Sequence, residues 1–355
     1  MTRVLFTGYA HAHFACFRPV YERLRGLAGV EVLLSGGLRR GNAVEGYTYD
    51  TDAMYAPFHP PAGAIRTVEE IAELDVDVLV CANTKPIMPR SHGCSVQIFH
   101  GLSFRNRAIR PENAGYDYYF VLGPYMHRRL GGCEAFAPDD PRLLTIGFPK
   151  TDRLLDGSLD RRAVLAAYGF SGERPVVLYA PTGAHGNSLE TMGEELLARL
   201  SGQGCYDILV KPHDHPKKPI DWFARLAPLE HEHLRLVRTP DVITPLFAAD
   251  LLISDASSVA NEYALLDRPI VFLDVPELLA AAAVEDQRLD LDTWGRKGGE
   301  VAADPISAVA AVARALADPQ RDGEARRAMT SDLFYNPGQA TVAAVGWLER
   351  KLALV

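Results

Sequence analysis

The chain has 355 residues, of which 48% are hydrophobic and 23% charged, values typical of a globular protein. This length is too great for one ordinary hydrophobic core and predicts two domains. The net charge of -8 at pH 7 argues against a general nucleic-acid binder, because such proteins gain most of their affinity from lysine and arginine residues that neutralise phosphates.

The cysteines and the apolar runs indicate the compartment. Five cysteines are scattered without the paired spacing of a disulfide framework or a zinc site, which fits a reducing cytoplasm. No run approaches the roughly 20 apolar residues of a membrane-spanning helix. The first residues lack the long apolar region and the cleavage site of a secretory signal. We therefore expect a cytoplasmic protein.

Short apolar runs alternate with longer mixed segments along the first part of the chain. The runs are rich in β-branched or aromatic residues and are bounded by Gly, Pro or Asn, a pattern that predicts buried strands. A helical pattern at Phe14–Leu27 follows the first run. The predicted strands are Val4–Thr7, Glu31–Ser35, Val78–Ala82, Val96–His100, Tyr118–Leu122 and Leu143–Ile146.

A second series begins after a break near residues 150–174. Its predicted strands are Val176–Ala180, Asp207–Lys211, Leu234–Arg238, Leu251–Ser254 and Ile270–Leu273. Helical patterns separate these strands at Leu189–Leu200, Trp222–Leu229 and Ser258–Leu266. The tail from Pro305 onward is helical, with a last helix near Gly338–Leu352.

This alternation predicts an α/β fold of two Rossmann-like domains, each a doubly wound parallel sheet with helices on both faces. We assign residues 1–155 to an N-terminal domain and 156–335 to a C-terminal domain that faces it across a cleft. Residues 336–355 are expected to form a helix that braces the first domain. Ligands bind beyond the carboxyl ends of the strands in such sheets, so the functional residues are sought in those loops.

The first candidate site follows the predicted strand at Leu251–Ser254. Asp255 comes directly after it, and Ser257 and Ser258 open a predicted helix, whose free backbone N–H groups and two hydroxyls favour a bound phosphate. Glu262 lies one turn along on the same face, where it can reach a ribose hydroxyl. Serine is also a common N-cap in helices of any function, so these residues alone leave a purely structural role open.

Two further strands end in histidine-containing loops. His100 is followed by Gly101, and an imidazole there can take a proton from a hydroxyl or can simply be held by a neighbouring carbonyl. Lys211 and His213 end another strand and can neutralise a diphosphate or protonate a leaving group. The histidines at 213, 215, 231 and 233 form two His-x-His pairs, but the second pair precedes a strand and belongs to the opposite sheet edge, so we expect no metal site.

Weaker signals concern the acceptor side and the missing motifs. His11 and His13 follow the first strand and suit an acceptor loop, although they can merely line the cleft. Arg105 belongs to Phe104–Arg110, which has three arginines in seven residues and indicates a local basic groove. The chain contains no G-x-G-x-x-G fingerprint, phosphate loop or nucleophile elbow, so dinucleotide-binding, kinase and serine-hydrolase interpretations lose their usual support.

Taken in order, five segments resemble the CDP-glycerol glycerophosphotransferase family of teichoic-acid and capsule polymer transferases. The resemblance runs from about Ser95 to Val345, and five elements in sequence are more specific than any one alone. The elements are Phe99-His100-Gly101, Gly147–Asp152, Leu178–Thr182, Lys211-Pro212-His213, and Asp255–Ser258 with Glu262 as the later carboxylate.

The resemblance implies a GT-B architecture, with the donor on the C-terminal domain and the acceptor on the N-terminal domain. His100 resembles the general base toward the acceptor hydroxyl, and His213 resembles the histidine that contacts the donor diphosphate and shares the catalytic role. The other implied contacts are Lys211, Ser257 and Ser258 to the diphosphate, Thr182, Asp255 and Glu262 to the nucleotide, and His11, His13 and Arg105 on the acceptor side.

The implied reaction is transfer of a polyol phosphate from a CDP-activated donor to a hydroxyl of a glycan or lipid-linked acceptor in cell-envelope polymer synthesis. No cofactor is required, and peripheral association with the inner face of the membrane is compatible with it. Phe99, Gly183-Ala184 and Ala256 depart from the family pattern and leave the donor open, and the chain favours a single addition over polymerisation. The alternatives are a GT-B glycosyltransferase that uses a nucleotide sugar and a non-catalytic nucleotide-binding module.

Overall fold

The computed structural model describes residues 1–42, 44, 46–83, 85–109, 111, 114–213, 220–286 and 289–352. Its contacts divide the chain into two compact units. The first comprises Met1–Gly101, Ala108–Asp152 and Asp332–Val355, and the second comprises Leu102–Arg107 and Arg153–Ser331. The last segment thus belongs to the first unit. The short segment Leu102–Arg107 belongs to the second unit, although the sequence predicts it in the first.

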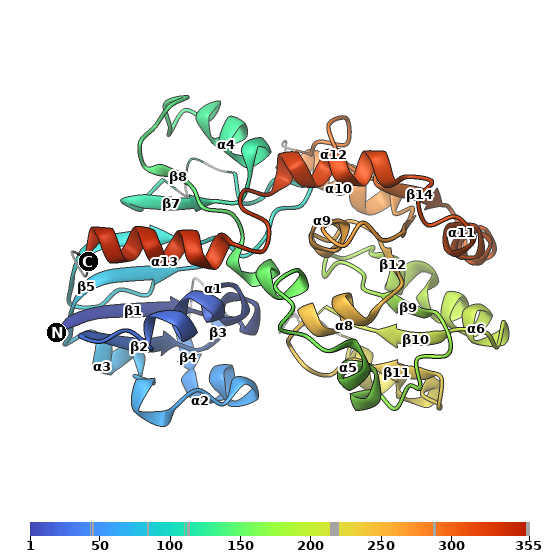
Figure 1. The fold of residues 1–355 in the computed structure, drawn as a ribbon, viewed down its shortest axis with the longest axis horizontal. Coiled ribbons are helices and arrows are strands. Elements are labelled where there is room, and N and C mark those ends of the chain that lie inside the picture. The colour runs from blue at the N-terminus through green and yellow to red at the C-terminus, as the bar shows by residue number, and fades with distance from the viewer. Residues whose placement is uncertain are drawn as a thin grey trace. The chain divides into compact units, whose positions relative to one another are not determined.

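The first unit is built on a six-stranded sheet with the order β2-β1-β5-β6-β7-β8, and every pair in it is parallel (Figure 1). The six strands are β1 Thr2–Gly8, β2 Val30–Gly36, β5 Asp75–Cys81, β6 Ser91–Gln97, β7 Tyr118–Val121 and β8 Leu143–Thr145. The helices are α1 His11–Leu24, α2 Thr51–Tyr55, α3 Val68–Ile71, α4 Pro124–Gly131 and α13 Ala340–Lys351, with short 3₁₀ turns η1 Ala56–Phe58, η2 Ala62–Ala64 and η4 Pro149–Leu154.

Aromatic side chains fix the helices to this sheet. Phe6 of β1 is completely buried and meets Phe17 and Tyr21 of α1, at ring-centroid distances of 5.1 and 6.1 Å. On α13, the Trp347 ring lies 4.8 Å from that of Tyr118 on β7. Central strands covered by helices on both faces are continuous apolar runs, which explains why most of these strands were predictable. The prediction Val96–His100 was displaced, because β6 runs over Ser91–Gln97 and its first half is polar.

A hairpin of β3 Leu38–Asn42 and β4 Gly46–Asp50 follows β2 and was not predicted. The chain turns into it at Gly36, whose φ is +92° and whose position allows no side chain, because a Cβ there would lie 1.9 Å from the Gly8 carbonyl oxygen. Most side chains of β4 are exposed or only half-buried. The hairpin therefore lacks the apolar pattern from which buried strands are predicted.

The second unit contains another six-stranded parallel sheet, with the order β11-β10-β9-β12-β13-β14. The strands are β9 Val176–Tyr179, β10 Asp207–Val210, β11 Leu234–Leu236, β12 Leu251–Ser254, β13 Ile270–Leu273 and β14 Gly299–Ala302. The helices are α5 Arg161–Ala167, α6 Glu194–Gly202 preceded by a π-turn η5 Leu189–Gly193, α7 Trp222–Leu226 followed by η6 Ala227–Leu229, α8 Ile243–Ala248, α9 Val259–Ala264, α10 Pro276–Asp286, α11 Pro305–Ala317 and α12 Gly323–Leu333.

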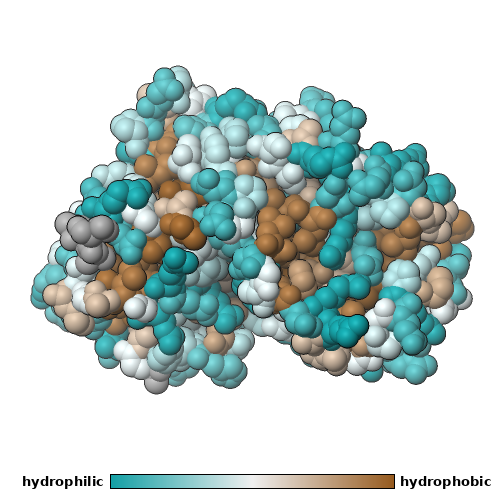
Figure 2. Space-filling model, in the orientation of Figure 1, coloured by the Kyte–Doolittle hydropathy of each residue, from teal (hydrophilic) through white to brown (hydrophobic). Residues whose placement is uncertain are grey.

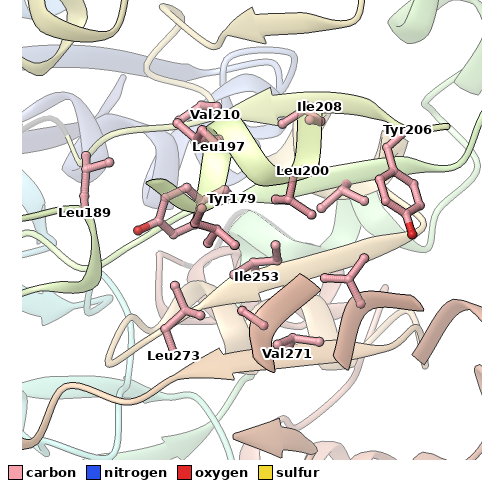
Figure 3. Close-up of a cluster of buried hydrophobic side chains, with 14 of the residues drawn as sticks. Tyr179, Leu189, Leu197, Leu200, Tyr206, Ile208, Val210, Ile253, Val271 and Leu273 are labelled. Atoms are coloured by element: carbon pink, nitrogen blue, oxygen red, sulfur yellow. The ribbon is translucent and has the colours of Figure 1, made fainter. Parts of the chain in front are cut away.

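The core of the second unit lies between the sheet and the helices α6 and α11 (Figure 3). Leu197 and Leu200 of α6 are completely buried and pack with Ile208 and Val210 of β10 and with Ile253 of β12. The remaining helices shield the sheet from water, so its strands are apolar along their length. Parallel pairing throughout both sheets confirms the predicted fold of two doubly wound α/β domains.

The surface carries hydrophilic residues over much of the face in view, with hydrophobic residues gathered in separate patches (Figure 2). Across the described ranges, no helix combines the length and the apolar character that crossing a membrane requires.

Candidate functional site

The topology of each sheet marks where a ligand is expected. In the second unit the strand order reverses between β9 and β12, and in the first unit it reverses between β1 and β5. Doubly wound sheets bind ligands at the carboxyl ends of the strands next to such a reversal. Thr182 and Asp255 follow the two strands in the second unit, and the loop after β1 leads into α1 with His11 and His13.

Asp255 organises the loops at the reversal point of the second unit. Its carboxylate is fully buried and accepts hydrogen bonds from the backbone N–H of Thr182 at 2.7 Å and of Ala256 at 2.6 Å. The same group accepts from the backbone N–H and the hydroxyl of Ser188, at 3.0 and 2.8 Å. Four bonds use the acceptor sites of one carboxylate. Asp255 therefore shapes the loop after β9, and its predicted contact with a nucleotide stays a prediction.

The helix after Asp255 is shorter than the predicted one. α9 begins at Val259, and its N-cap residue Ser258 has helical dihedral angles (φ -64°, ψ -19°) with no side-chain capping bond among the described residues. Ser257 accepts from the Val259 N–H only at 3.5 Å. The two hydroxyls are thus not committed to capping the helix. Glu262 is 2% exposed, so its predicted contact with a ribose hydroxyl would need the residues around it to move.

Lys211 and His213 lie beside the loop after β9. The Lys211 backbone N–H donates to the Tyr179 carbonyl at 2.9 Å, and its buried side chain reaches the Pro212 carbonyl at 3.5 Å. The exposed His213 ring rests on Gly183, where a Cβ would come within 2.7 Å of the ring atoms Cγ and Nδ1. The structure therefore brings the loops after β9, β10 and β12 together, and with them the predicted donor-side residues.

His100 lies in the first unit, three residues beyond the end of β6. The preceding Phe99 has φ +51° although it is a bulky residue, and such strain persists only where the surroundings enforce it. The His100 Nδ1 lies 2.8 Å from the Ala82 carbonyl oxygen. A carbonyl only accepts, so Nδ1 carries the proton and the neutral ring keeps its lone pair on Nε2. The predicted carbonyl contact and a base function are therefore compatible.

The surroundings of His100 favour its neutral form. The side chain is exposed, but the protein around it removes part of its hydration and so lowers its pKa below the ordinary value. The bond to Ala82 acts in the opposite direction, and the positive charge of Lys150 lowers the pKa further. A neutral imidazole with a free Nε2 is the form that accepts a proton.

Of the two histidines after β1, only His13 meets His100. Its ring centroid lies 5.1 Å from that of His100, and its Nδ1 accepts from the Tyr9 N–H at 3.1 Å. Burial lowers the pKa of His13 well below its ordinary value, and the charges of His100 and Arg39 act in the same direction. The His11 Nε2 instead donates to the Ala53 carbonyl at 3.1 Å. His11 therefore lies against α2, apart from the His13–His100 pair.

Arg105 is placed differently from the prediction. It is buried in the segment Leu102–Arg107 of the second unit, and its predicted acceptor-side role stays a prediction. This segment is anchored to α9, because the Asn261 side chain donates to the Leu102 carbonyl at 2.7 Å. Phe104 packs in a small apolar cluster with Val275. The sequence offered no signal for this anchor, since Asn261 is distant along the chain.

The element Gly147–Asp152 has a structural role. The Asp152 carboxylate accepts from the N–H groups of Ala340 and Thr341, at 3.1 and 2.6 Å, and so caps the start of α13. Gly147 has φ +99°, and a Cβ there would lie 2.1 Å from the Tyr335 carbonyl oxygen. This element therefore holds α13 in the first unit through hydrogen bonds and close backbone packing.

No group of three potential metal ligands occurs among the residues that the structure describes. His231 and His233 precede β11, at the sheet edge opposite the donor-side loops, and the His233 Nδ1 lies 2.8 Å from Asp207. His215 of the other pair and Arg110 of the basic run lie outside the described residues.

Comparisons with known proteins agree with this arrangement. A family model described as CDP-Glycerol:Poly(glycerophosphate) glycerophosphotransferase matches residues 93–342. The teichoic acid glycerol-phosphate primase of Bacillus spizizenii is 32% identical over 170 residues, which are 47% of this chain and 42% of the relative. The teichoic acid ribitol-phosphate primase of the same organism is 30% identical over 173 residues, 46% of this chain and 42% of the relative. The matches thus span less than half of these relatives.

Solved structures share the fold. A structure of the wall teichoic acid polymerase TagF covers 99% of this chain and 89% of its own, with a TM-score of 0.71 and 16% identity. The complex of Staphylococcus aureus MnaA with UDP covers 100% of this chain and 98% of its own, with a TM-score of 0.62 and 12% identity. These similarities confirm the predicted GT-B-like fold.

Proposed function

We propose a function from the premise that this chain belongs to the CDP-glycerol:poly(glycerophosphate) glycerophosphotransferase family: it transfers a polyol phosphate from a CDP-activated donor to an acceptor hydroxyl. The names of the two primases support glycerol phosphate or ribitol phosphate as the transferred group. The acceptor in this proposal is a glycan or a lipid-linked glycan at the cytoplasmic face of the membrane.

His100 acts as the base in this proposal. With Nδ1 donating to the Ala82 carbonyl, its Nε2 takes the proton of the acceptor hydroxyl. The hydroxyl oxygen then forms a bond to the β-phosphorus of the donor, and the bond from that phosphorus to the bridging oxygen breaks. CMP leaves with the electron pair, and the product is a phosphodiester. The fixed tautomer of His100 is the observation that carries the proposal. A general base needs an unprotonated nitrogen that is held toward the acceptor hydroxyl, and Nε2 is that nitrogen here.

The donor side supplies charge neutralisation. Lys211 carries a positive charge, and the uncapped hydroxyls of Ser257 and Ser258 can donate to phosphate oxygens. His213, exposed beside Gly183, can protonate the departing CMP. Phosphoryl transfer needs alignment and charge neutralisation and no covalent enzyme intermediate.

Replacement of His100 by Ala tests the base. CMP release from CDP-glycerol and CDP-ribitol is measured with a synthetic glycan acceptor, and donor affinity is measured by titration. Turnover should fall by about 10² to 10⁴, the usual effect of losing a general base, while the donor Kd stays unchanged. Unchanged turnover in His100→Ala would exclude this role. The unmodified protein is also tested with UDP-sugars. If it uses them and uses neither CDP donor, the reaction is glycosyl transfer and the proposed function is wrong.

A further inference from the structure

An arginine stacked on two tyrosines lies near the proposed base in the first unit, and the mechanism above does not use it. The Cζ atom of Arg39, on β3, lies 4.0 Å from the centroid of the Tyr9 ring and 4.5 Å from that of the Tyr47 ring. Contacts of this kind hold a guanidinium by cation–π attraction while its N–H groups remain at the edge of the stack.

Backbone bonds fix the place of Arg39. Its N–H donates to the Tyr9 carbonyl at 3.3 Å, and the Gly37 N–H donates to the Gly8 carbonyl at 3.1 Å. Within the hairpin, Arg39 is paired with Tyr49 of β4. The hairpin therefore holds Arg39 against the loop after β1, and this arrangement does not depend on the charge of the side chain.

The N–H donors of the Arg39 guanidinium find no acceptor among the residues that the structure describes. In the described part of the chain, its guanidinium makes no hydrogen bond or ion pair with a protein group. The adjacent Arg40 differs, because it is paired with Asp50 at 2.9 Å. A guanidinium has five N–H donors in a fork that matches the oxygens of a phosphate. Tyr47 is 40% exposed, so the stack is open to solvent from its side.

A chain of ring contacts joins this stack to the proposed base. The Tyr9 ring lies 4.4 Å from the His13 ring, which lies 5.1 Å from the His100 ring. All of these residues belong to the first unit. An anion held by Arg39 would therefore lie on the same side of this unit as the base.

We infer that Arg39, stacked on Tyr9 and Tyr47, binds an anionic phosphate group of the acceptor and thereby selects the hydroxyl presented to His100. This inference rests on the proposed function, since it assigns the chemistry of the acceptor in that reaction. The phosphate is either that of a polyol phosphate unit already on the acceptor or the diphosphate that joins a glycan to its lipid. Both present the same oxygens to the guanidinium.

The test compares Arg39→Ala with Arg40→Ala, a neighbouring arginine on the same strand that is engaged by Asp50. Three synthetic acceptors are used: a glycan that ends in glycerol phosphate, the same glycan without phosphate, and the same glycan with a diphosphate at its reducing end. Arg39→Ala should raise KM at least tenfold for a phosphate-bearing acceptor, because hydrogen bonds to charged groups are strong. The phosphate-free acceptor and the donor Kd should not change. Arg39→Lys should restore part of the loss, since it keeps the charge without the fork.

The acceptor that loses affinity identifies the source of the phosphate. An unchanged KM for both phosphate-bearing acceptors, an equal loss on the phosphate-free glycan, or the same loss in Arg40→Ala would overturn the inference. Calorimetric titration of the phosphate-bearing glycans without donor provides a reading that needs no turnover. If the protein binds these glycans through Arg39 but accepts no CDP-linked donor, the proposed function fails while the acceptor site stands.

Discussion

Gly183 shows how the absence of a side chain leaves room for a neighbouring ring, here that of His213, the proposed proton donor. Its backbone is not in the left-handed region, so its conformation does not require glycine. The atoms that an added Cβ would meet are those of the His213 ring. This is one of the positions where the chain departs from the pattern of the family it resembles. The sequence showed the departure, but only the structure shows that the His213 ring takes up the space.

Gly183→Ala should therefore displace His213 and lower turnover, with little change in the free energy of unfolding. In a His213→Ala background the same change should have no further effect on turnover, because the two residues act through one contact. Gly202→Ala, at a site with open space around it, is the control. Additive losses in the double variant would show that Gly183 acts in some other way.

Burial of His13 makes the first unit sensitive to acid. Its pKa lies well below the ordinary value of 6.5, so in the unfolded chain it binds a proton at pH values where the folded chain does not. The contribution of His13 to the free energy of unfolding is therefore fully present above pH 6.5. It is lost as the pH decreases below that value, by up to about 1.4 kcal/mol per pH unit for one group.

Urea unfolding at pH 7 and pH 5 measures this effect. The free energy of unfolding should fall less between these pH values in His13→Gln, because the variant lacks the group that binds the extra proton on unfolding. The variant also loses a buried ring, which lowers its free energy of unfolding at pH 7. Each protein is therefore compared with its own value at pH 7. An identical pH dependence in both proteins would mean that folding does not lower the pKa of His13.

At the scale of elements, most strands were predictable from the sequence, and the hydrogen bonds between distant elements were not. β12 and β13 match their predicted ranges, because buried parallel strands are continuous apolar runs. β14 and the β3–β4 hairpin were missed, since their partly exposed residues lack that pattern. The element Gly147–Asp152 was noticed only through a resemblance. Its task is to cap α13, nearly two hundred residues away, and no local pattern can indicate such a contact.

Asp152→Ala should destabilise the first unit by about 1 to 2 kcal/mol, the usual effect of losing a helix cap. Gln339, the N-cap residue of α13, does not replace it, because its side chain makes no capping bond in the described residues. Since the proposed donor contacts lie in the second unit, the donor Kd should not change. Thermal unfolding and donor titration of the same variant separate the two effects. A loss of donor affinity with unchanged unfolding would assign Asp152 to the site.

At the scale of the whole molecule, the candidate site was predicted as a set of loops more reliably than as a set of contacts. The rule that ligands bind beyond strand ends located the loops of Thr182, Lys211 and Ser257, and the structure brings these loops together. Asp255 and Arg105 are buried, which the sequence did not indicate, because burial and hydrogen-bond partners depend on distant segments. Arg39 was overlooked for the same reason, since its two tyrosine neighbours are separated in sequence.

The composition of the first unit has a consequence for synthesis on the ribosome. This unit contains the N-terminal residues, but it also requires α13, which belongs to Asp332–Val355. The second unit needs only residues between 102 and 331, all of which are made earlier. Domains generally fold as units during synthesis, with the N-terminal one first. Here we expect the order to be reversed, because the residues of the first unit that are made early can pack against α13 only after it has been made.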